Sequence, residues 1–72
     1  MTSHKTDEPR VNHQIKTERI RLIDADGEMI GVTTVEDGIK RARAVGLDLV
    51  EVSPNAAPPV CKILDYGKFK YQ

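Results

Sequence analysis

The 72-residue sequence predicts one small α+β domain, in which a single helix covers one face of a four-stranded mixed sheet. Two observations lead to this prediction. Short runs of alternating apolar and polar residues, typical of strands, lie on both sides of one stretch whose apolar residues have helical spacing. Turn residues or prolines separate these runs, so the expected order is strand, strand, helix, strand, strand. The helical crossover favours parallel strands on either side of it, which makes the sheet mixed.

The first two strands are expected to form a β-hairpin. Ile20 and Leu22 alternate with arginines in the first strand, and Ile30 and Val32 are expected on one face of the return strand. The connecting residues 24–28 (DADGE) contain the Asp-Gly pair that is typical of hairpin turns. Their three acids resemble a calcium loop only superficially, because such a loop needs ligands at alternating positions over about a dozen residues.

A helix is expected to run roughly from Val35 to Val45. Thr34 is a favourable N-cap residue, because its hydroxyl oxygen can accept a hydrogen bond from the first turn. Gly46 is the residue type that most often ends a helix in the left-handed conformation. One face of this helix is apolar, with residues at spacings of four, three and three: Val35, Ile39, Ala42 and Val45.

The third strand is expected at Leu47–Val52 and the fourth at Val60–Leu64. Residues 53–59 between them contain three prolines, which cannot donate to a sheet ladder, so this segment is predicted to be a loop. Glu51 is expected in solvent, which would point Val50 and Val52 toward the core. The sheet face that the helix leaves open is then expected to carry Arg19, Arg21, Met29, Glu51 and Lys62.

The chain is expected to divide into a flexible arm (residues 1–14), a globular domain (15–65) and the start of another helix or linker (66–72). Residues 1–20 hold no apolar run suited to a signal peptide, and nothing approaches the roughly 20 apolar residues of a membrane span. The single cysteine is typical of a reducing compartment. We therefore expect a cytoplasmic protein without a membrane partner.

No segment has the pattern of a catalytic or metal site. Cys61 lies among apolar residues of a predicted strand, where packing in the core explains it better than a nucleophile paired with His4 or His13. The histidines lack metal-ligand spacing, and the sequence contains neither a phosphate-binding Gly-rich loop nor paired catalytic carboxylates. The expectation is a protein that is not an enzyme and that uses no cofactor or metal.

The formal charge is zero, with 11 basic and 11 acidic residues, which argues against a strongly basic nucleic-acid-binding domain. The charges are nevertheless segregated, since basic residues prevail between Arg10 and Leu22 and again from Lys62 onward. Arg21 and Lys62 occupy outward strand positions, where basic side chains either contact phosphates or are simply solvated. Two interpretations, stacking on bases and packing against the sheet, also stay open for three aromatic residues: Tyr66, Phe69 and Tyr71.

A series of motifs along residues 10–72 resembles the N-terminal domain of bacterial translation initiation factor 3. The longest continuous match is residues 48–71, DLVEVSPNAAPPVCKILDYGKFKY, and runs of this length with two proline clusters rarely recur by chance. In order, the matching motifs are RVNHQI at 10–15, RLI at 21–23, GV at 31–32, GLDLVEVSPN at 46–55, PPVCKI at 58–63 and DYGK at 65–68.

The resemblance implies a β-grasp-like fold in which the second strand lies at one edge, followed by the first, the fourth and the third. This order would place Arg21 and Lys62 on adjacent strands. It also implies binding to the small ribosomal subunit, through 16S-type rRNA and platform proteins, close to the initiator tRNA. The family keeps the ribosomal subunits apart and supports correct pairing of initiator tRNA with the start codon.

The resemblance further implies a monomer whose linker leads to a C-terminal domain of the same factor. The residues expected to contact RNA or the ribosome are Arg21, Lys62, Arg19, Met29, Lys68, Lys70 and Arg10. Those expected to form the linker exit are Tyr66, Gly67 and Tyr71. The alternative is a β-grasp protein-interaction module that binds a protein through the open face without direct RNA contact.

Overall fold

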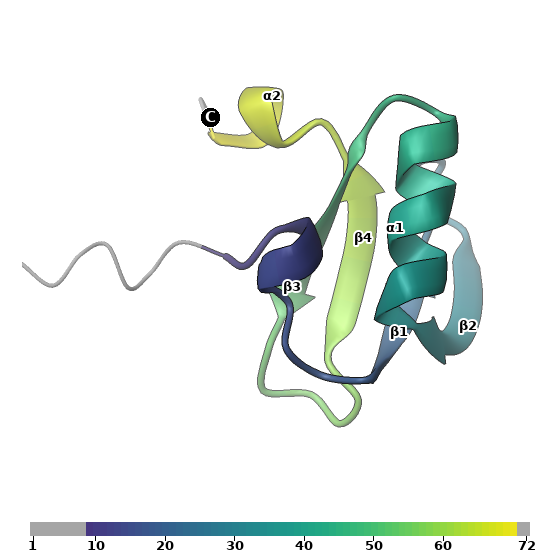
Figure 1. Cartoon of the computed structure of the whole chain (residues 1–72), viewed down its shortest axis with the longest axis vertical. Coiled ribbons are helices and arrows are strands. Elements are labelled where there is room, and N and C mark those ends of the chain that lie inside the picture. The colour runs from purple at the N-terminus through teal and green to yellow at the C-terminus, as the bar shows by residue number, and fades with distance from the viewer. Residues whose placement is uncertain (1–8, 71–72) are drawn as a thin grey trace, which may run out of the picture.

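The computed structural model describes residues 9–70 of the chain (Figure 1). A 3-10 turn, η2, precedes the sheet, and a short helix, α2, follows it. The elements are η2 (Asn12–Gln14), β1 (Arg19–Ile23), β2 (Met29–Thr34), α1 (Val35–Ala44), β3 (Asp48–Ser53), β4 (Val60–Leu64) and α2 (Tyr66–Lys70).

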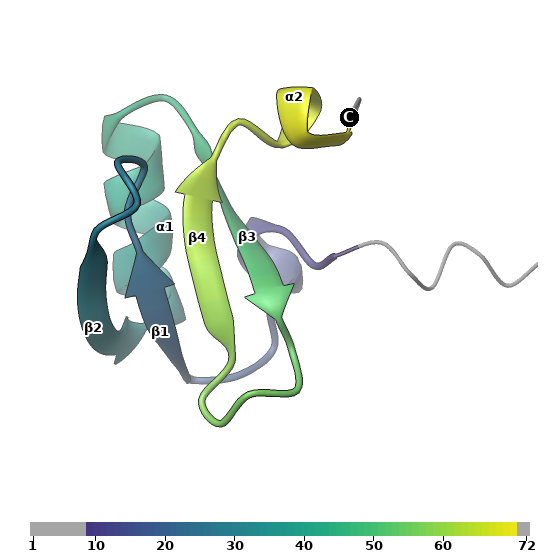
Figure 2. The same cartoon turned by 180° about the vertical axis from the view of Figure 1, so that it is seen from behind.

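The four strands form one sheet in the order β2-β1-β4-β3, which confirms the expected β-grasp-like arrangement. The central strands β1 and β4 are parallel, whereas β2 and β3 pair antiparallel with their neighbours. Helix α1 packs across one face of this sheet, and the opposite face has no helix over it (Figures 1 and 2). The sheet is therefore mixed and covered on one side, as the order of elements predicted.

The hydrophobic core lies between α1 and the sheet. Alternate residues of β1 and β4 point into it, and the apolar stripe of α1 packs on them. The core consists of Ile15, Ile20, Leu22, Val35, Ile39, Ala42, Leu49, Cys61 and Ile63, with the half-buried Leu47 against it. Val45, expected at the end of the same stripe, is 58% exposed, because α1 ends one residue earlier, at Ala44.

Both ends of α1 are held by the residues that the sequence predicted. Thr34 is the N-cap, since its Oγ1 accepts from the backbone N–H of Asp37 at 3.1 Å. Gly46 has φ 73°, and its N–H donates to the carbonyl oxygen of Arg43 while that of Leu47 donates to Ala42. These two bonds form a Schellman motif, which requires the left-handed residue at this position.

Helix α1 lies in close contact with the sheet at Gly38. A Cβ atom there would lie 2.9 Å from Leu49 Cδ2 and 3.1 Å from Ile20 Cδ1. Leu49 and Ile20 are both fully buried, so neither side chain has space into which it can move. The short distance between α1 and the sheet at this point therefore requires a residue without a side chain.

The hairpin of β1 and β2 is confirmed, but its second strand contains an irregularity that the sequence did not reveal. Oδ1 of Asp24 accepts from the backbone N–H groups of Asp26 and Glu28 and thereby fixes the turn. Ile23 pairs with Met29 and Leu22 with Gly31, so that Ile30 is an extra residue. The prediction that Ile30 and Val32 share a face was therefore wrong.

Ile30 instead lines a shallow hollow beside the carboxyl half of α1, together with Arg41, Ala44 and Val45. Val32 pairs with Arg21 and is 52% exposed on the open face. The bulge thus moves one apolar side chain of the hairpin to the solvent side of the sheet.

The predicted orientation of β3 was also wrong. Glu51 pairs with Cys61, a core residue, so its side chain lies on the helix-covered side, where it is only 4% exposed. Its carboxylate forms an ion pair with Arg10, with Nη1 and Oε1 3.3 Å apart, which offsets the cost of burying the charge. Val50 is fully buried, as predicted, although it pairs with Lys62 and not with a residue that points toward α1. Val52 lies at a second irregularity of pairing and is 40% exposed.

Cys61 is a fully buried core residue, as its apolar neighbours in the sequence predicted. Burial, together with the nearby negative charge of Glu51, raises the pKa of its thiol to about 12. The thiol is therefore protonated at physiological pH, which opposes a nucleophilic role.

The segment before β1, assigned to the arm as far as residue 14, contacts β3 in its last residues. Glu51 donates its backbone N–H to the carbonyl oxygen of Arg10, and Val11 forms a bridge with Val50. Residues 1–8, the rest of that arm, lie outside the described residues. Between residues 9 and 70 there is no helix long and apolar enough to cross a membrane.

We predict that Gly38→Ala lowers the free energy of unfolding by about 1 kcal/mol in chemical denaturation. The gain in helix propensity is about 1 kcal/mol, whereas overpacking a close contact costs roughly 1–3 kcal/mol. Lys40→Ala, at an exposed position of the same helix, is the control and should change stability by less than about 0.5 kcal/mol. A Gly38→Ala variant more stable than the original chain would show that the layers are not in tight contact.

We predict that iodoacetamide at about pH 8 modifies the folded chain at least roughly a hundred-fold more slowly than the denatured chain, because burial and the raised pKa of Cys61 both suppress thiolate attack. Mass spectrometry of the single cysteine measures both rates. The denatured chain serves as the internal control. Equal rates in the two states would show that Cys61 is accessible and reactive in the fold.

Candidate nucleic-acid interface

The candidate interface is the sheet face that α1 does not cover. Arg19, Arg21 and Ile23 point to this face from β1, because Ile20 and Leu22 between them point into the core. On β4, Lys62 pairs with Ile23, and Val60 pairs with Arg21. Arg21 and Lys62 are thus diagonal neighbours on adjacent strands, offset by two residues along the strands. The two strands are about 5 Å apart in the hydrogen-bonding direction.

The sequence prediction that Arg21 and Lys62 share one face of adjacent strands agrees with this register. Arg19, two residues before Arg21, extends the line of cations toward the start of β1 and is exposed. We call Arg19, Arg21 and Lys62 the basic face. None of them forms an ion pair with another residue of the range 9–70, where the two ion pairs are Arg10–Glu51 and Arg41–Asp37.

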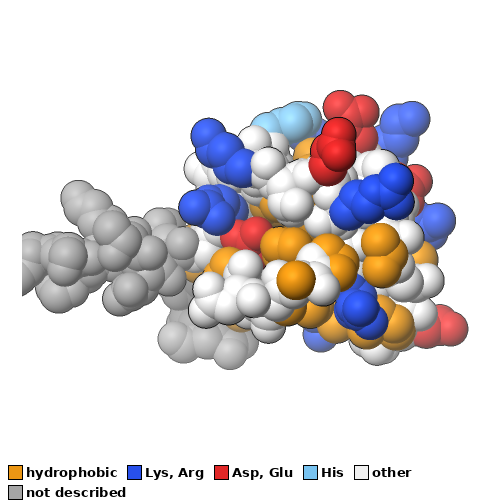
Figure 3. All heavy atoms as spheres, turned by 90° about the horizontal axis from the view of Figure 1, so that it is seen from below, with side chains coloured by type: hydrophobic (Ala, Val, Ile, Leu, Met, Phe, Trp, Pro, Cys, Tyr) orange, Lys and Arg blue, Asp and Glu red, His pale blue; other side chains and the backbone are white. Residues whose placement is uncertain are grey.

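Apolar side chains lie among these cations. Met29 pairs with Ile23 and is 52% exposed, so it stands on the open face as predicted, beside Val32. Sequence reasoning did not assign Val32 and Ile23 to this face; alternation within β1 was the signal for Ile23, whereas the bulge concealed Val32. Figure 3 views a different surface, the end formed by the β3–β4 loop and the start of β1, where apolar side chains lie at the centre with basic and acidic side chains around them.

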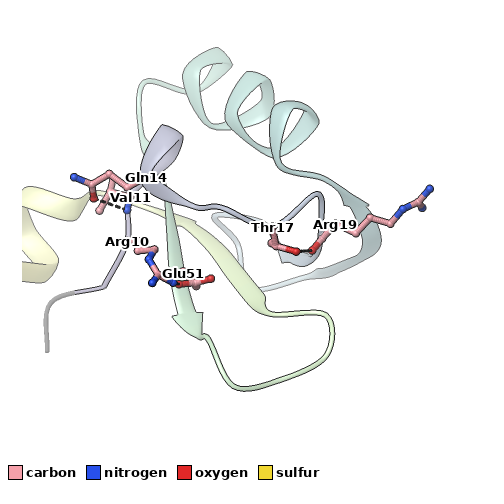
Figure 4. A network of polar contacts seen from close by, with 6 residues as sticks. All are labelled: Arg10, Val11, Gln14, Thr17, Arg19 and Glu51. Atoms are coloured by element: carbon pink, nitrogen blue, oxygen red, sulfur yellow. Dashed lines mark hydrogen bonds and ion pairs between the residues drawn. The ribbon is translucent and has the colours of Figure 1, made fainter. Parts of the chain in front are cut away.

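Arg10 lies apart from the basic face. It comes from the segment along the outer edge of β3, and its guanidinium contacts the carboxylate of Glu51 on the helix-covered side. Figure 4 shows this pair at one end of the view, with Arg19 extending away from the domain at the other. An ion pair already occupies Arg10, although its side chain is still 55% exposed.

The residues expected to support the site from the carboxyl end lie on α2, beyond the end of β4 (Figure 2). Lys68 is exposed, and its backbone N–H donates to Oδ1 of Asp65. The rings of Tyr66 and Phe69 stack on each other, with centroids 6.2 Å apart and an angle of 29° between planes. Phe69 is 42% exposed, so it is accessible for contact with a partner. The Lys70 side chain and Tyr71 lie outside the described residues.

The described part of the chain offers no metal site. Within residues 9–70, no group of three or more His, Cys, Asp or Glu side chains is placed to hold a metal ion. A shallow hollow of about 510 Å³ between residues 13–19 and the start of α1 has an apolar floor of Ile15, Val35 and Ile39. Its rim carries both acidic and basic side chains without a consistent charge. The basic face is therefore the surface with the clearest chemical preference, namely for an anionic partner such as a phosphate backbone.

Comparison with known proteins gives one consistent answer. The model of the family "Translation initiation factor IF-3, N-terminal domain" matches residues 11–72. The chain is 59% identical over 66 residues to translation initiation factor IF-3 of Xanthobacter autotrophicus, a match that covers 92% of this chain and 38% of that protein. It is 61% identical over 64 residues to the protein of the same name from Parvibaculum lavamentivorans, covering 89% and 37%.

A third relative gives the same result. IF-3 of Aquifex aeolicus is 56% identical over 68 residues, a match that covers 94% of this chain and 39% of that protein. The chain thus spans less than two fifths of the length of these curated relatives. The match to the family model extends from the segment along β3 to the end of the chain. The chain belongs to the translation initiation factor IF-3 family, in which it corresponds to the N-terminal domain.

Proposed function

We propose that the chain binds the small ribosomal subunit close to the initiator tRNA through the basic face. Membership in the IF-3 family supports a role in translation initiation. In this proposal Arg21 and Lys62, with Arg19, contact the phosphate backbone of 16S-type rRNA or of the tRNA. Binding there supports correct pairing of initiator tRNA with the start codon and helps to keep the ribosomal subunits apart. Platform proteins of the subunit border the contact.

The observation that carries the proposal is the line of three cations without ion-pair partners among residues 9–70, on the one sheet face without a helix. Phosphate contacts from such side chains fix position and orientation without reading sequence. Because the whole chain is neutral, attraction depends on this local arrangement, and its range is about 10 Å at 0.1 M salt.

Three cations provide weak binding on their own. We infer that a longer protein compensates by tethering this domain to a C-terminal domain that binds the ribosome more tightly. The linker in this proposal starts at α2, with Tyr66, Gly67 and Tyr71 at the exit and Lys68 and Lys70 giving additional phosphate contacts. Tethering raises the effective concentration of the domain at its site to the millimolar range when the linker is short.

The exposed apolar residues of the same face favour a second candidate function, contact with a protein partner. Met29 and Val32 are each 52% exposed, and Ile23 of β1 is paired with Lys62 of β4. Apolar area at the centre with charges around it is the usual composition of a protein interface. Photo-crosslinking from position 32 separates the two functions, since products with rRNA or tRNA support the first and products with ribosomal proteins alone support the second.

We predict that the double variant Arg21→Ala, Lys62→Ala binds small ribosomal subunits with a reduced dependence on salt. Each lost phosphate contact should lower the slope of log K against log[salt] by about 0.7–0.9. The measurement is fluorescence anisotropy of the N-terminally labelled chain, titrated with purified subunits at several salt concentrations.

The matched control for this experiment is Lys40→Ala, Arg43→Ala, which removes the same charge from exposed positions of α1, on the other layer of the domain. Its slope should equal that of the original chain. If both double variants lower the slope equally, attraction comes from net charge alone and the basic face is not the interface.

A further inference from the structure

The segment Arg10–Asn12 lies against the outer edge of β3, where the sheet would otherwise end. The backbone N–H of Glu51 donates to the carbonyl oxygen of Arg10 at 2.9 Å, and Val11 forms an antiparallel bridge with Val50. The ion pair of Arg10 with Glu51 adds a side-chain contact (Figure 4). This docked segment therefore satisfies donors of an edge strand that would otherwise face solvent.

Asn12 makes the contact that ends the docked segment. Its φ of 52° is in the left-handed region, which asparagine tolerates better than most residues. Its Oδ1 accepts from the backbone N–H of Leu49 at 2.9 Å, and its Nδ2 donates to Oδ1 of Asp48 at 3.1 Å. The amide of Asn12 thus bonds to two consecutive residues of β3 at once.

The second carboxylate oxygen of Asp48 contacts a different element. Oδ2 accepts from the backbone N–H of Tyr66, the first residue of α2, at 3.4 Å. The N–H groups of a first helical turn have no partner within the helix, and a carboxylate there is electrostatically favourable. A helix of five residues is too short to be stable without such contacts.

We propose that Asp48 couples the docked N-terminal segment to α2, so that the segment determines whether the exit from the domain is held in a fixed direction. Asn12 holds one carboxylate oxygen and thereby fixes the orientation of the other toward Tyr66. Coupling of this kind is reciprocal. Removal of Arg10–Asn12 from β3 by a binding partner weakens the bond between Asp48 and Tyr66, and reorientation of α2 weakens the contact of Asn12. The proposal concerns the fold alone and does not depend on RNA binding.

The test is amide hydrogen exchange, followed by NMR in the 72-residue chain, of the original protein and of Asn12→Ala. The variant should speed exchange at Leu49, which loses its acceptor. It should also raise the exchange rates of Tyr66 and Phe69 by about five-fold or more, which is the lower end of typical coupling between sites. Asp48→Asn, which keeps the shape of the side chain, should accelerate Leu49 and Tyr66 together. In the double variant, Asn12→Ala should add nothing at Tyr66 to the effect of Asp48→Asn.

Thr34→Ala is the control, because it removes the side-chain hydrogen bond that caps α1 at the end of β2, the strand at the opposite edge of the sheet from β3. It should leave the exchange rates of Tyr66 and Phe69 unchanged. The proposal is overturned if Asn12→Ala accelerates exchange at Leu49 alone, or if Asp48→Asn accelerates exchange at only one of Leu49 and Tyr66. Equal acceleration at Tyr66 in Thr34→Ala would likewise overturn it, by showing general loss of stability instead of coupling.

Discussion

The structure depends on the contact between a single ten-residue helix and the sheet beneath it. A helix of this length is about 15 Å long and has one apolar stripe, so it can bury one sheet face and no more. Gly38 allows the two layers to approach closely enough for Leu49 and Ile20 to be fully buried. No second helix of comparable length exists among residues 9–70, so the other sheet face has no helix over it. The side chains on that face are those that alternate with core residues along the strands. Arg21 and Lys62 are displayed there because their neighbours must point into the core.

The features that could be predicted from the sequence are those that depend on residues close together in the chain. The N-cap bond of Thr34 spans three residues, and the turn at Asp24 is closed by its own side chain. Gly46 ends α1 by bonds to the preceding turn. Alternation is unambiguous in β1 and β4, which is why Arg21 and Lys62 were placed correctly. The strand order, in contrast, came only from resemblance to a family.

The predicted side-chain orientations were wrong in β3 and β2, where a contact with a residue distant in the chain or an extra residue decides which face a side chain is on. In β3 the run Leu49, Val50, Glu51, Val52 offers an apolar residue on either face, and a charged residue is ordinarily assigned to solvent. The partner that permits burial of Glu51 is Arg10, separated from it by 41 residues. The bond between Asn12 and Asp48 spans 36 residues and was equally invisible. At Ile30 a single extra residue reverses the face to which the later residues of β2 point, as any shift of strand register does.

The neutral charge of the chain conceals a difference in role between acids and bases. Several acidic side chains are engaged within the fold: Asp24, Asp37, Asp48, Glu51 and Asp65. Asp37 illustrates the effect, since its bonds with Arg41 and Thr33 lower the pKa of its carboxyl. The bases Arg19, Arg21 and Lys62 have no such partner among the described residues.

The acids therefore hold turns, helix ends and edges in place, whereas the cations of the open face remain available to an anionic partner. Net charge, as a sum over both groups, is a poor guide to binding in a domain of this size. The same carboxylates also connect remote parts of the chain, and Asp48 does so at the point where the chain leaves the sheet. A partner bound at the open face would therefore be positioned relative to the start of α2 by the acids of this fold. In the proposed function the cations of the open face bind the partner, whereas the acids hold the turns, the helix ends and the start of α2 in place.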